Sequence, residues 1–397
     1  MIVRNYRSFC LLFIINCLFI FIVLFQRSIY EAFSCFISLS ILLFIFVFAD
    51  YFIFKNFKFT FFVYLLNSLG IFIQILMDVN VKTSLFAILL GFICIGLYKL
   101  FMNYSFNYKW FIFLEVLLFV VLFLFGDNVS NTKAWLRIGS YSMQLTEILK
   151  VLSVLFYCEM VSIDDKFKIS SIFFGIQIIG CLFINELGTL LILGILYLVM
   201  MYVLLDLNLF IKILIGIVGL CFIGIFIISI LIKFELHSIS NPILLSLVNI
   251  AYKLHTRFML VVNLDSMDAY GVAYQTNQAM NGIVLGGLFG KPEAFNLPVG
   301  MFDYPLICMM IKVGLIYVIL FNLIVACLIY ELWNIYRKSN KNRILILSIM
   351  TLLISQIIIS ELGQFNLFPL TGIGTPFISQ GGTLAFITTF LINIIHI

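Results

Sequence analysis

Six ionisable side chains stand inside or at the edges of long apolar segments, namely Glu147, Lys150, Glu159, Glu186, Lys312 and Glu361. A charged group inside a membrane-spanning helix costs about 2.5–3.5 kcal/mol on insertion scales, so we treat each of them as a functional-site hypothesis. The chemistry open to such groups is proton transfer, capture of a charged substrate, or ion pairing with one another.

Glu147 and Lys150 are three positions apart, which places both on one face of a helix at the outer end of their segment. They could form a purely structural ion pair, or they could belong to a substrate site. Glu186 lies in the string Asn185 to Thr189, at the outer start of another apolar segment. Glu159 lies near the inner end of its segment and Glu361 near the outer end of another, where we expect interfacial positions.

The elements that position these residues must be membrane-spanning helices. The 397 residues are 64% hydrophobic and 10% charged, whereas soluble chains carry about 25% charged residues. The net charge of +5 comes from basic residues scattered singly, which does not indicate a nucleic-acid-binding protein. We predict an all-α polytopic membrane protein of about 12 transmembrane helices, at residues 8–25, 33–54, 58–77, 84–101, 110–126, 143–162, 170–184, 187–206, 209–233, 305–331, 343–362 and 377–395.

The distribution of Lys and Arg between alternate loops predicts the orientation. With a cytoplasmic N-terminus and a retained first segment, thirteen fall inside: Arg4, Arg7, Lys55, Lys58, Lys99, Lys109, Lys166, Lys168, Lys212, Arg337, Lys338, Lys341 and Arg343. The short outer loops hold four: Arg27, Lys82, Lys133 and Arg137. This bias places the polar loop 234–304 outside the cell, where residues 241–262 have apolar side chains at helical spacing and predict a helix in the membrane interface or on the bundle.

No protein-held metal or redox centre is expected. The nine cysteines lie in or beside apolar runs without a C-x-x-C pair, and His237, His255 and His396 are isolated. Two glycine-rich strings, Gly286 to Lys291 and Pro369 to Gly382, fall in the outer regions. Such strings allow the backbone to approach a ligand closely, or break a helix beside a cavity.

Several of these strings, taken in order, resemble the SEDS family (shape, elongation, division and sporulation), which includes RodA, FtsW and SpoVE. The family motif R-R-W-I is similar to the string Lys133 to Leu136, and the motif Q-P-S-E-x-x-K is similar to Gln144 to Lys150. The motif P-D-L-G-T is similar to Asn185 to Thr189. Tyr274 to Gln278 with Gly286 to Gly290 is similar to Y-Q-x-x-Q-S and G-G-L-F-G. The strings Leu297 to Asp303 and Pro369 to Gly382 are similar to L-P-E-A-H-T-D and P-V-T-G-I-P-L-P-F-I-S-Y-G-G.

The resemblance implies a SEDS-type helical bundle with the family's usual ten spans and two more at the N-terminus. Residues 1–126 would be N-terminal helices including the extra pair, and 127–397 the SEDS core with the extracellular loop 234–304. It also implies a peptidoglycan glycosyltransferase that polymerises lipid II at the outer face of the bacterial cell membrane, with a class B penicillin-binding protein as partner. No cofactor is implied with certainty, although a divalent cation could be held by the substrate pyrophosphate.

The same resemblance assigns site residues. Asp303 would be the base that takes the proton of the acceptor hydroxyl, although without the resemblance it reads as a helix cap. Lys150 is the preferred cation for the leaving pyrophosphate, and the other expected substrate-binding residues are Trp135, Glu147, Glu186, Arg257, Gln275, Lys291 and Ser379.

Two alternative functions remain open. A flippase for a lipid-linked precursor would use Glu147, Lys150 and Glu186 as coupling or substrate residues. An inactive scaffold for a class B penicillin-binding protein is suggested by Val299 and Met301, which stand where the family motif has Glu and His.

Overall fold

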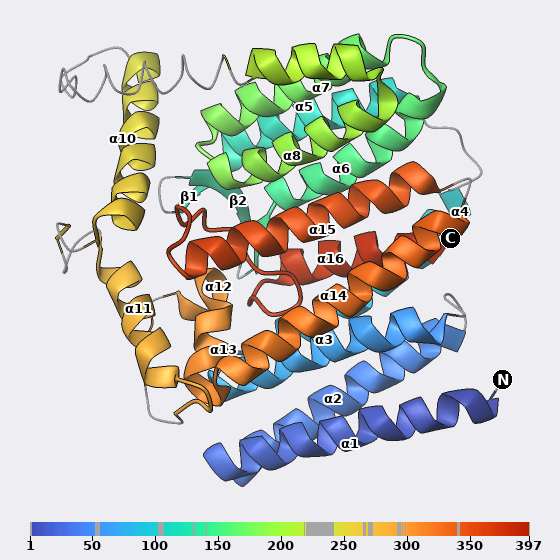
Figure 1. Cartoon of the computed structure of the whole chain (residues 1–397), viewed down its shortest axis with the longest axis vertical. Coiled ribbons are helices and arrows are strands. Elements are labelled where there is room, and N and C mark those ends of the chain that lie inside the picture. The colour runs from blue at the N-terminus through green and yellow to red at the C-terminus, as the bar shows by residue number, and fades with distance from the viewer. Residues whose placement is uncertain are drawn as a thin grey trace.

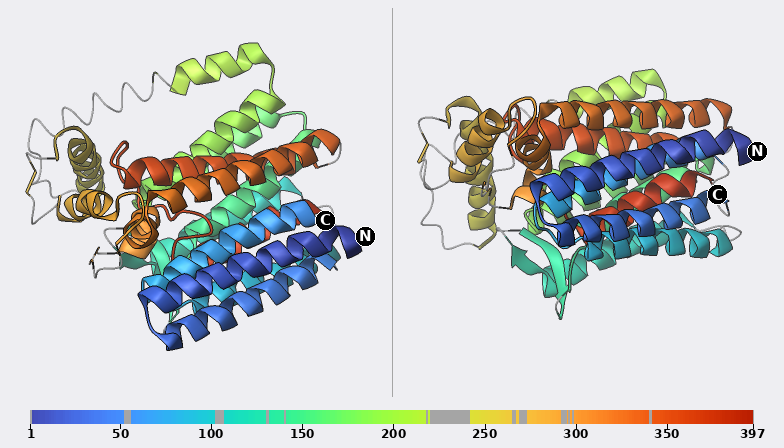
Figure 2. Two further views of the ribbon diagram at one scale, coloured as in Figure 1. Left: turned by 60° about the horizontal axis from the view of Figure 1, so that its bottom comes forward. Right: turned by 90° about the horizontal axis from the view of Figure 1, so that it is seen from below.

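Long helices lie side by side in one bundle (Figures 1 and 2). The computed structural model describes residues 2–51, 56–101, 107–129, 132–139, 141–217, 219, 242–264, 267–268, 273–291, 295, 297, 299–339 and 342–396. The bundle helices are α1 (Ile2–Gln26), α2 (Ile29–Ala49), α3 (Phe57–Leu76), α4 (Lys82–Phe101), α5 (Tyr108–Phe125), α6 (Thr146–Glu159), α7 (Lys166–Phe183), α8 (Leu187–Leu204), α14 (Leu315–Lys338), α15 (Arg343–Gln364) and α16 (Gly382–Asn393).

Eight of the described helices are long and apolar enough to cross a membrane: α2, α3, α4, α5, α7, α8, α14 and α15. Shorter apolar helices at Cys10–Gln26, Leu207–Ile217 and Gly382–His396 fall on three more of the predicted spans, and α6 falls on the span at 143–162. The chain is therefore a multi-pass membrane protein. The most buried of the eight is α3, with 89% of its apolar window inside the protein.

Two predicted spans were wrong in their boundaries. The continuous helix expected at 305–331 is broken at Gly314, whose φ of +92° is open to glycine and strained for other residues. The break separates α13 (Pro305–Val313) from α14. The last helix begins at Gly382 instead of 377, because residues 365–381 form an irregular loop that packs into the bundle.

A small sheet interrupts the helices and was missing from the all-α prediction. Strands β1 (Asp127–Val129), β2 (Thr132–Ile138) and β3 (Tyr141–Gln144) are antiparallel in the order β1-β2-β3. The strands are short and lie between apolar segments of membrane length, so the hydropathy of the chain gives no sign of them. We call the end of the bundle that carries this sheet the site end.

The polar loop contributes helices across the site end. The predicted interface helix is confirmed as a helix, α10 (Pro242–Val262), which Figure 1 shows running across the ends of the bundle helices. It is followed by α11 (Tyr274–Gly286) and the single turn α12 (Gly300–Asp303). Helix α11 approaches α13 closely, since a Cβ added at Gly286 would lie 2.5 Å from the Met310 oxygen.

Candidate active site

Asp303 is the last residue of α12, held between α11 and the loop 365–381. Val299, in the left-handed region with φ of +52°, starts the turn, and Pro305 begins α13 just after it. Gln275 Nε2 donates to Asp303 Oδ2 over 3.4 Å, and Gly372 of the loop lies close to Asp303 Oδ1. Burial raises the pKa of Asp303 to about 6, against the opposing effects of Gln275 and the Arg257 guanidinium.

Helix α10 carries Arg257, whose side chain lies within electrostatic range of Asp303. Its charge interacts with both Glu186 and Asp303, and burial lowers its pKa below the ordinary value while the two carboxylates act to raise it. One turn earlier, Lys253 Nζ donates to the Asn185 oxygen over 3.3 Å. Burial and the neighbouring Arg257 lower the pKa of Lys253 to about 8, with Glu186 opposing them. Two half-buried cations therefore lie between two acids.

Glu186 immediately precedes α8 and is 7% exposed. Thr189 Oγ1 donates to Glu186 Oε1 over 3.2 Å, as the residue three positions into a helix can do. Burial raises the pKa of Glu186, with Thr189 and Lys253 lowering it. Arg257 thus connects Glu186 to Asp303, although the two acids are far apart in the sequence.

Glu147 and Lys150 form the ion pair that their spacing predicts. Lys150 Nζ lies 2.6 Å from Glu147 Oε1, and the two residues are 2% and 4% exposed. Lys150 also donates to Gln356 Oε1 of α15 over 2.9 Å, and Gln356 Nε2 donates to the Gly374 oxygen over 2.9 Å. The pair therefore lies beneath the loop 365–381 and is connected to it through Gln356.

Ser379 connects the same loop to α12. Its hydroxyl accepts from the Thr375 backbone N–H over 2.7 Å and donates to the Phe302 oxygen over 3.1 Å, while Gln380 N–H donates to the Met301 oxygen over 2.8 Å. Ser379 is 4% exposed. It contacts the residue next to Asp303, so its position in the structure is that of a support for α12.

Trp135 reaches the site from β2. Its ring centroid lies 5.6 Å from that of Phe302, at an interplanar angle of 52°. The sheet is fixed to the bundle where the Gln144 backbone N–H donates to Thr383 Oγ1 over 3.1 Å. Trp135 is half-buried, and its partner Phe302 directly precedes Asp303 in the chain.

Lys291 is the one expected site residue that no described contact joins to the rest. Its side chain is exposed, and its backbone N–H donates to the Ile311 oxygen at the end of α13 over 2.7 Å. The structure thus brings Asp303, Arg257, Gln275 and Glu186 together. It places Trp135, Ser379 and the Glu147–Lys150 pair around them.

Glu115, an acid in the middle of α5, was not among the candidate residues predicted from the sequence. Its side chain is fully buried and faces Gln177 of α7, whose Nε2 donates to Ser153 Oγ of α6 over 2.8 Å. The signal was present, since Glu115 is an acid within a predicted span. Glu361 of α15, which was expected at the interface, is half-buried and faces Asn322.

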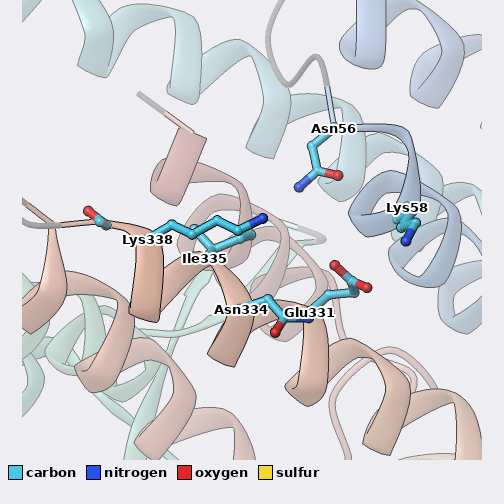
Figure 3. Close-up of a pocket in the computed structure, with 7 residues that line it drawn as sticks. Asn56, Lys58, Glu331, Asn334, Ile335 and Lys338 are labelled. Carbon is cyan, nitrogen blue, oxygen red and sulfur yellow. The ribbon is translucent and has the colours of Figure 1, made fainter.

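A polar cavity of about 540 Å³ lies at the opposite end of the bundle, between the start of α3 and the end of α14 (Figure 3). It is lined by Asn56, Lys58, Glu331, Asn334, Ile335, Lys338 and Ser339. Because α12 and α13 meet the other ends of these helices, this cavity is remote from Asp303. Within the described part of the chain, no three His, Cys, Asp or Glu side chains gather to hold a metal ion.

Comparisons with known proteins find relatives in sequence and in fold. A family model for cell cycle proteins of the FtsW, RodA and SpoVE type matches residues 51–397. A probable peptidoglycan glycosyltransferase FtsW from Enterococcus hirae is 28% identical over 141 residues, which cover 32% of this chain and only 34% of that relative.

Solved structures share the fold over most of the chain. One of them is a chain of a peptidoglycan synthase complex that coordinates polymerization and crosslinking. It superposes with a TM-score of 0.57 at 15% sequence identity, and the match covers 86% of this chain and 96% of that chain. The rod shape determining protein RodA of Thermus thermophilus has a TM-score of 0.52 and 13% identity, and covers 86% and 95%. At these identities the likeness concerns the fold alone.

Proposed function

Because the chain belongs to the FtsW, RodA and SpoVE family of cell cycle proteins, we propose that it is a peptidoglycan glycosyltransferase that polymerises lipid II. The observation that carries the proposal is a half-buried carboxylate, Asp303, that interacts electrostatically with the guanidinium of Arg257. We further propose that this end of the bundle faces the outside of a bacterial cytoplasmic membrane, as the distribution of Lys and Arg predicts.

Asp303 is the base in this mechanism. The hydroxyl oxygen of the acceptor sugar attacks the anomeric carbon of the donor, the bond from that carbon to the pyrophosphate oxygen breaks, and Asp303 receives the hydroxyl proton. A pKa of about 6 suits this role, because the carboxylate is mostly ionised at pH 7 and is more basic than an exposed aspartate. Gln275 orients the carboxylate through its hydrogen bond.

Arg257 and Lys253 stabilise the departing pyrophosphate. Negative charge develops on the leaving group in a partly desolvated site, where fixed cations act strongly. The geometry favours Arg257 over Lys150, since two N–H groups of Lys150 already donate to Glu147 and Gln356. Lys150 remains a proposed substrate-site residue, acting at least through Gln356 on the loop. Any divalent ion would be carried by the pyrophosphate.

The surfaces around the base bind the rest of the substrate. The open part of Trp135 can pack against a sugar ring or the isoprenoid chain beside Phe302. Glu186 supplies a counter-charge to Arg257, and Lys291, exposed beyond α11, is available to a more distant anionic group. The proposed partner is a class B penicillin-binding protein, which the likeness to a chain in a peptidoglycan synthase complex supports.

A polymerisation assay with purified lipid II tests the function. We expect activity from the wild type, in the presence or absence of a class B penicillin-binding protein, and a loss of about 10²–10⁴-fold in Asp303→Asn, which keeps the shape and removes the basicity. Asp164→Asn, at an exposed acid between α6 and α7, is the matched control and should be near wild type.

Near-normal polymerisation by Asp303→Asn would remove this residue from the mechanism. A folded wild type that is inactive where a RodA control works would favour a scaffold. The buried Glu115 beside Gln177 adds to Glu147, Lys150 and Glu186 as a feature that favours a flippase. A flippase would translocate lipid II in vesicles and have no polymerase activity, and Glu115→Gln would reduce the translocation.

A further inference from the structure

The N-terminal hairpin of α1 and α2 precedes the segment that matches the family, which begins at residue 51. It lies along α3 at one edge of the bundle (Figure 2). Asn16 Nδ2 donates to Tyr64 Oη over 2.6 Å, and the rings of Phe19 and Phe72 stack with centroids 4.5 Å apart. These contacts fix α1 on α3 within the membrane.

The last residue of α1 reaches beyond α3 to α13. Gln26 Nε2 donates to the Lys312 backbone oxygen over 3.2 Å. The final carbonyl groups of a helix have no partner within it. At the end of α13 the Met310 oxygen accepts from Gly314, the Ile311 oxygen from Lys291, and the Lys312 oxygen from Gln26. Gln26 alone among these donors comes from outside the family match.

Arg27, the residue after Gln26, contacts the end of α3. Its Nη2 donates to the Leu76 oxygen at the end of α3, and its Nη1 lies 2.8 Å from Asp78 Oδ2. Helix α3 in turn contacts the loop 365–381, where Gln74 Nε2 donates to the Ile378 oxygen over 3.2 Å. The hairpin therefore contacts both α13, which follows Asp303, and the helix that supports the loop around Ser379.

We propose that the N-terminal hairpin is a brace built into this chain, and that Gln26 is a positioning residue for Asp303. The chain of contacts runs from Gln26 to the end of α13, along α13 to Pro305, and from there to Asp303. Because α13 packs closely on α11, a displacement of α13 would also move Gln275 away from the carboxylate. This inference rests on the proposed role of Asp303.

The test compares Gln26→Leu with Asn16→Leu in the purified full-length protein. Each change replaces an amide on α1 by an aliphatic side chain and removes one hydrogen bond to another helix, but only the first bond reaches α13. Gln26→Ala is a second variant that cannot clash with α13. Amide exchange over Met310 to Tyr317 measures the order of the helix end, and the pH dependence of polymerisation measures the surroundings of Asp303.

We expect both Gln26 variants to accelerate exchange in this segment by at least threefold, and Asn16→Leu to leave it unchanged. We also expect the acid limb of kcat/KM to move below pH 6 in the Gln26 variants. Loosening the site weakens the Gln275 hydrogen bond, which by itself would raise the pKa of Asp303, but it also admits water, and burial is the larger of the two effects on this pKa. Equal exchange in all three variants and the wild type would overturn the brace. An inactive wild type would contradict the proposed function instead, and the exchange measurement would still decide the brace.

Discussion

At the scale of the residue, burial sets the chemistry of the site. Burial shifts the pKa of each of four site residues in the direction that favours its neutral form, and oppositely charged or hydrogen-bonding neighbours oppose the shift. These residues are Asp303, Glu186, Lys253 and Arg257. An alternation of carboxylates and cations lowers the free-energy cost of holding such charges in a partly dry environment. A substrate pyrophosphate entering this cluster would meet cations whose counter-charges are already in place.

The pH dependence of polymerisation follows from Asp303. Its pKa is raised from 3.8 to about 6, so the group is protonated and inactive as a base below about pH 6. We expect kcat/KM to fall about tenfold per pH unit below this value and to level off above it. In Gln275→Leu the limb should move to higher pH, because the lost hydrogen bond had stabilised the carboxylate. A limb that stays unmoved, measured with lipid II over pH 5–8, would contradict the assignment.

At the scale of the element, irregular backbone is held between regular helices. The loop 365–381 is joined to α6 through Lys150 and Gln356, and to α12 through Ser379. Its interior is fixed by Ser360 and Gln364 of α15, both of which contact Thr375. Non-helical backbone at membrane depth persists only where protein or a cavity satisfies its polar groups, and the side chains of α6 and α15 meet that condition here.

A charge-removal series tests the pair under this loop. Lys150→Met alone leaves Glu147 buried and unpaired, which costs roughly 3–5 kcal/mol, so we expect a strong loss of thermal stability. The double change Glu147→Gln with Lys150→Met should recover most of that stability. We expect it to lose at least tenfold in polymerisation, because Gln356 no longer receives a bond from a charged donor.

The measurements are a melting temperature in detergent and a lipid II assay on the same preparations. A double variant that polymerises at the wild-type rate would reduce the pair to a purely structural one.

At the scale of the whole molecule, the two ends of the helical bundle differ. The broken helix α13–α14, the small sheet and α10 to α12 all gather at one end, and the polar cavity lined by Lys58 and Lys338 lies at the other. A bilayer would separate these two ends, so the proposed lipid-linked substrate would reach the candidate site from one face only.

The orientation is open to a direct test. A reporter fused after Ser240 should be external and one fused after Asn340 cytoplasmic, because Lys and Arg accumulate in the loops predicted to lie inside. Paired alkaline phosphatase and fluorescent-protein fusions measure both positions. The reverse signal at either one would contradict the arrangement of spans.

The sequence by itself determined the helices, because the hydropathy of a membrane span is a local property of about twenty consecutive residues. It likewise placed Glu147 and Lys150 on one helix face, because they lie about one helical turn apart. Its motifs also named Asp303 and Gln275, and its outward basic residues included Arg257, but without any distance between them.

Only the tertiary structure decided which of these strings meet. Lys150 and Gln356 are 206 positions apart, and Gln26 and Lys312 are 286 apart, so no local pattern could relate them. The break at Gly314 and the sheet at 127–144 depend in the same way on packing against distant elements. Periodicity reports which face of a helix is apolar, whereas the identity of the neighbour on that face is fixed when the whole bundle closes.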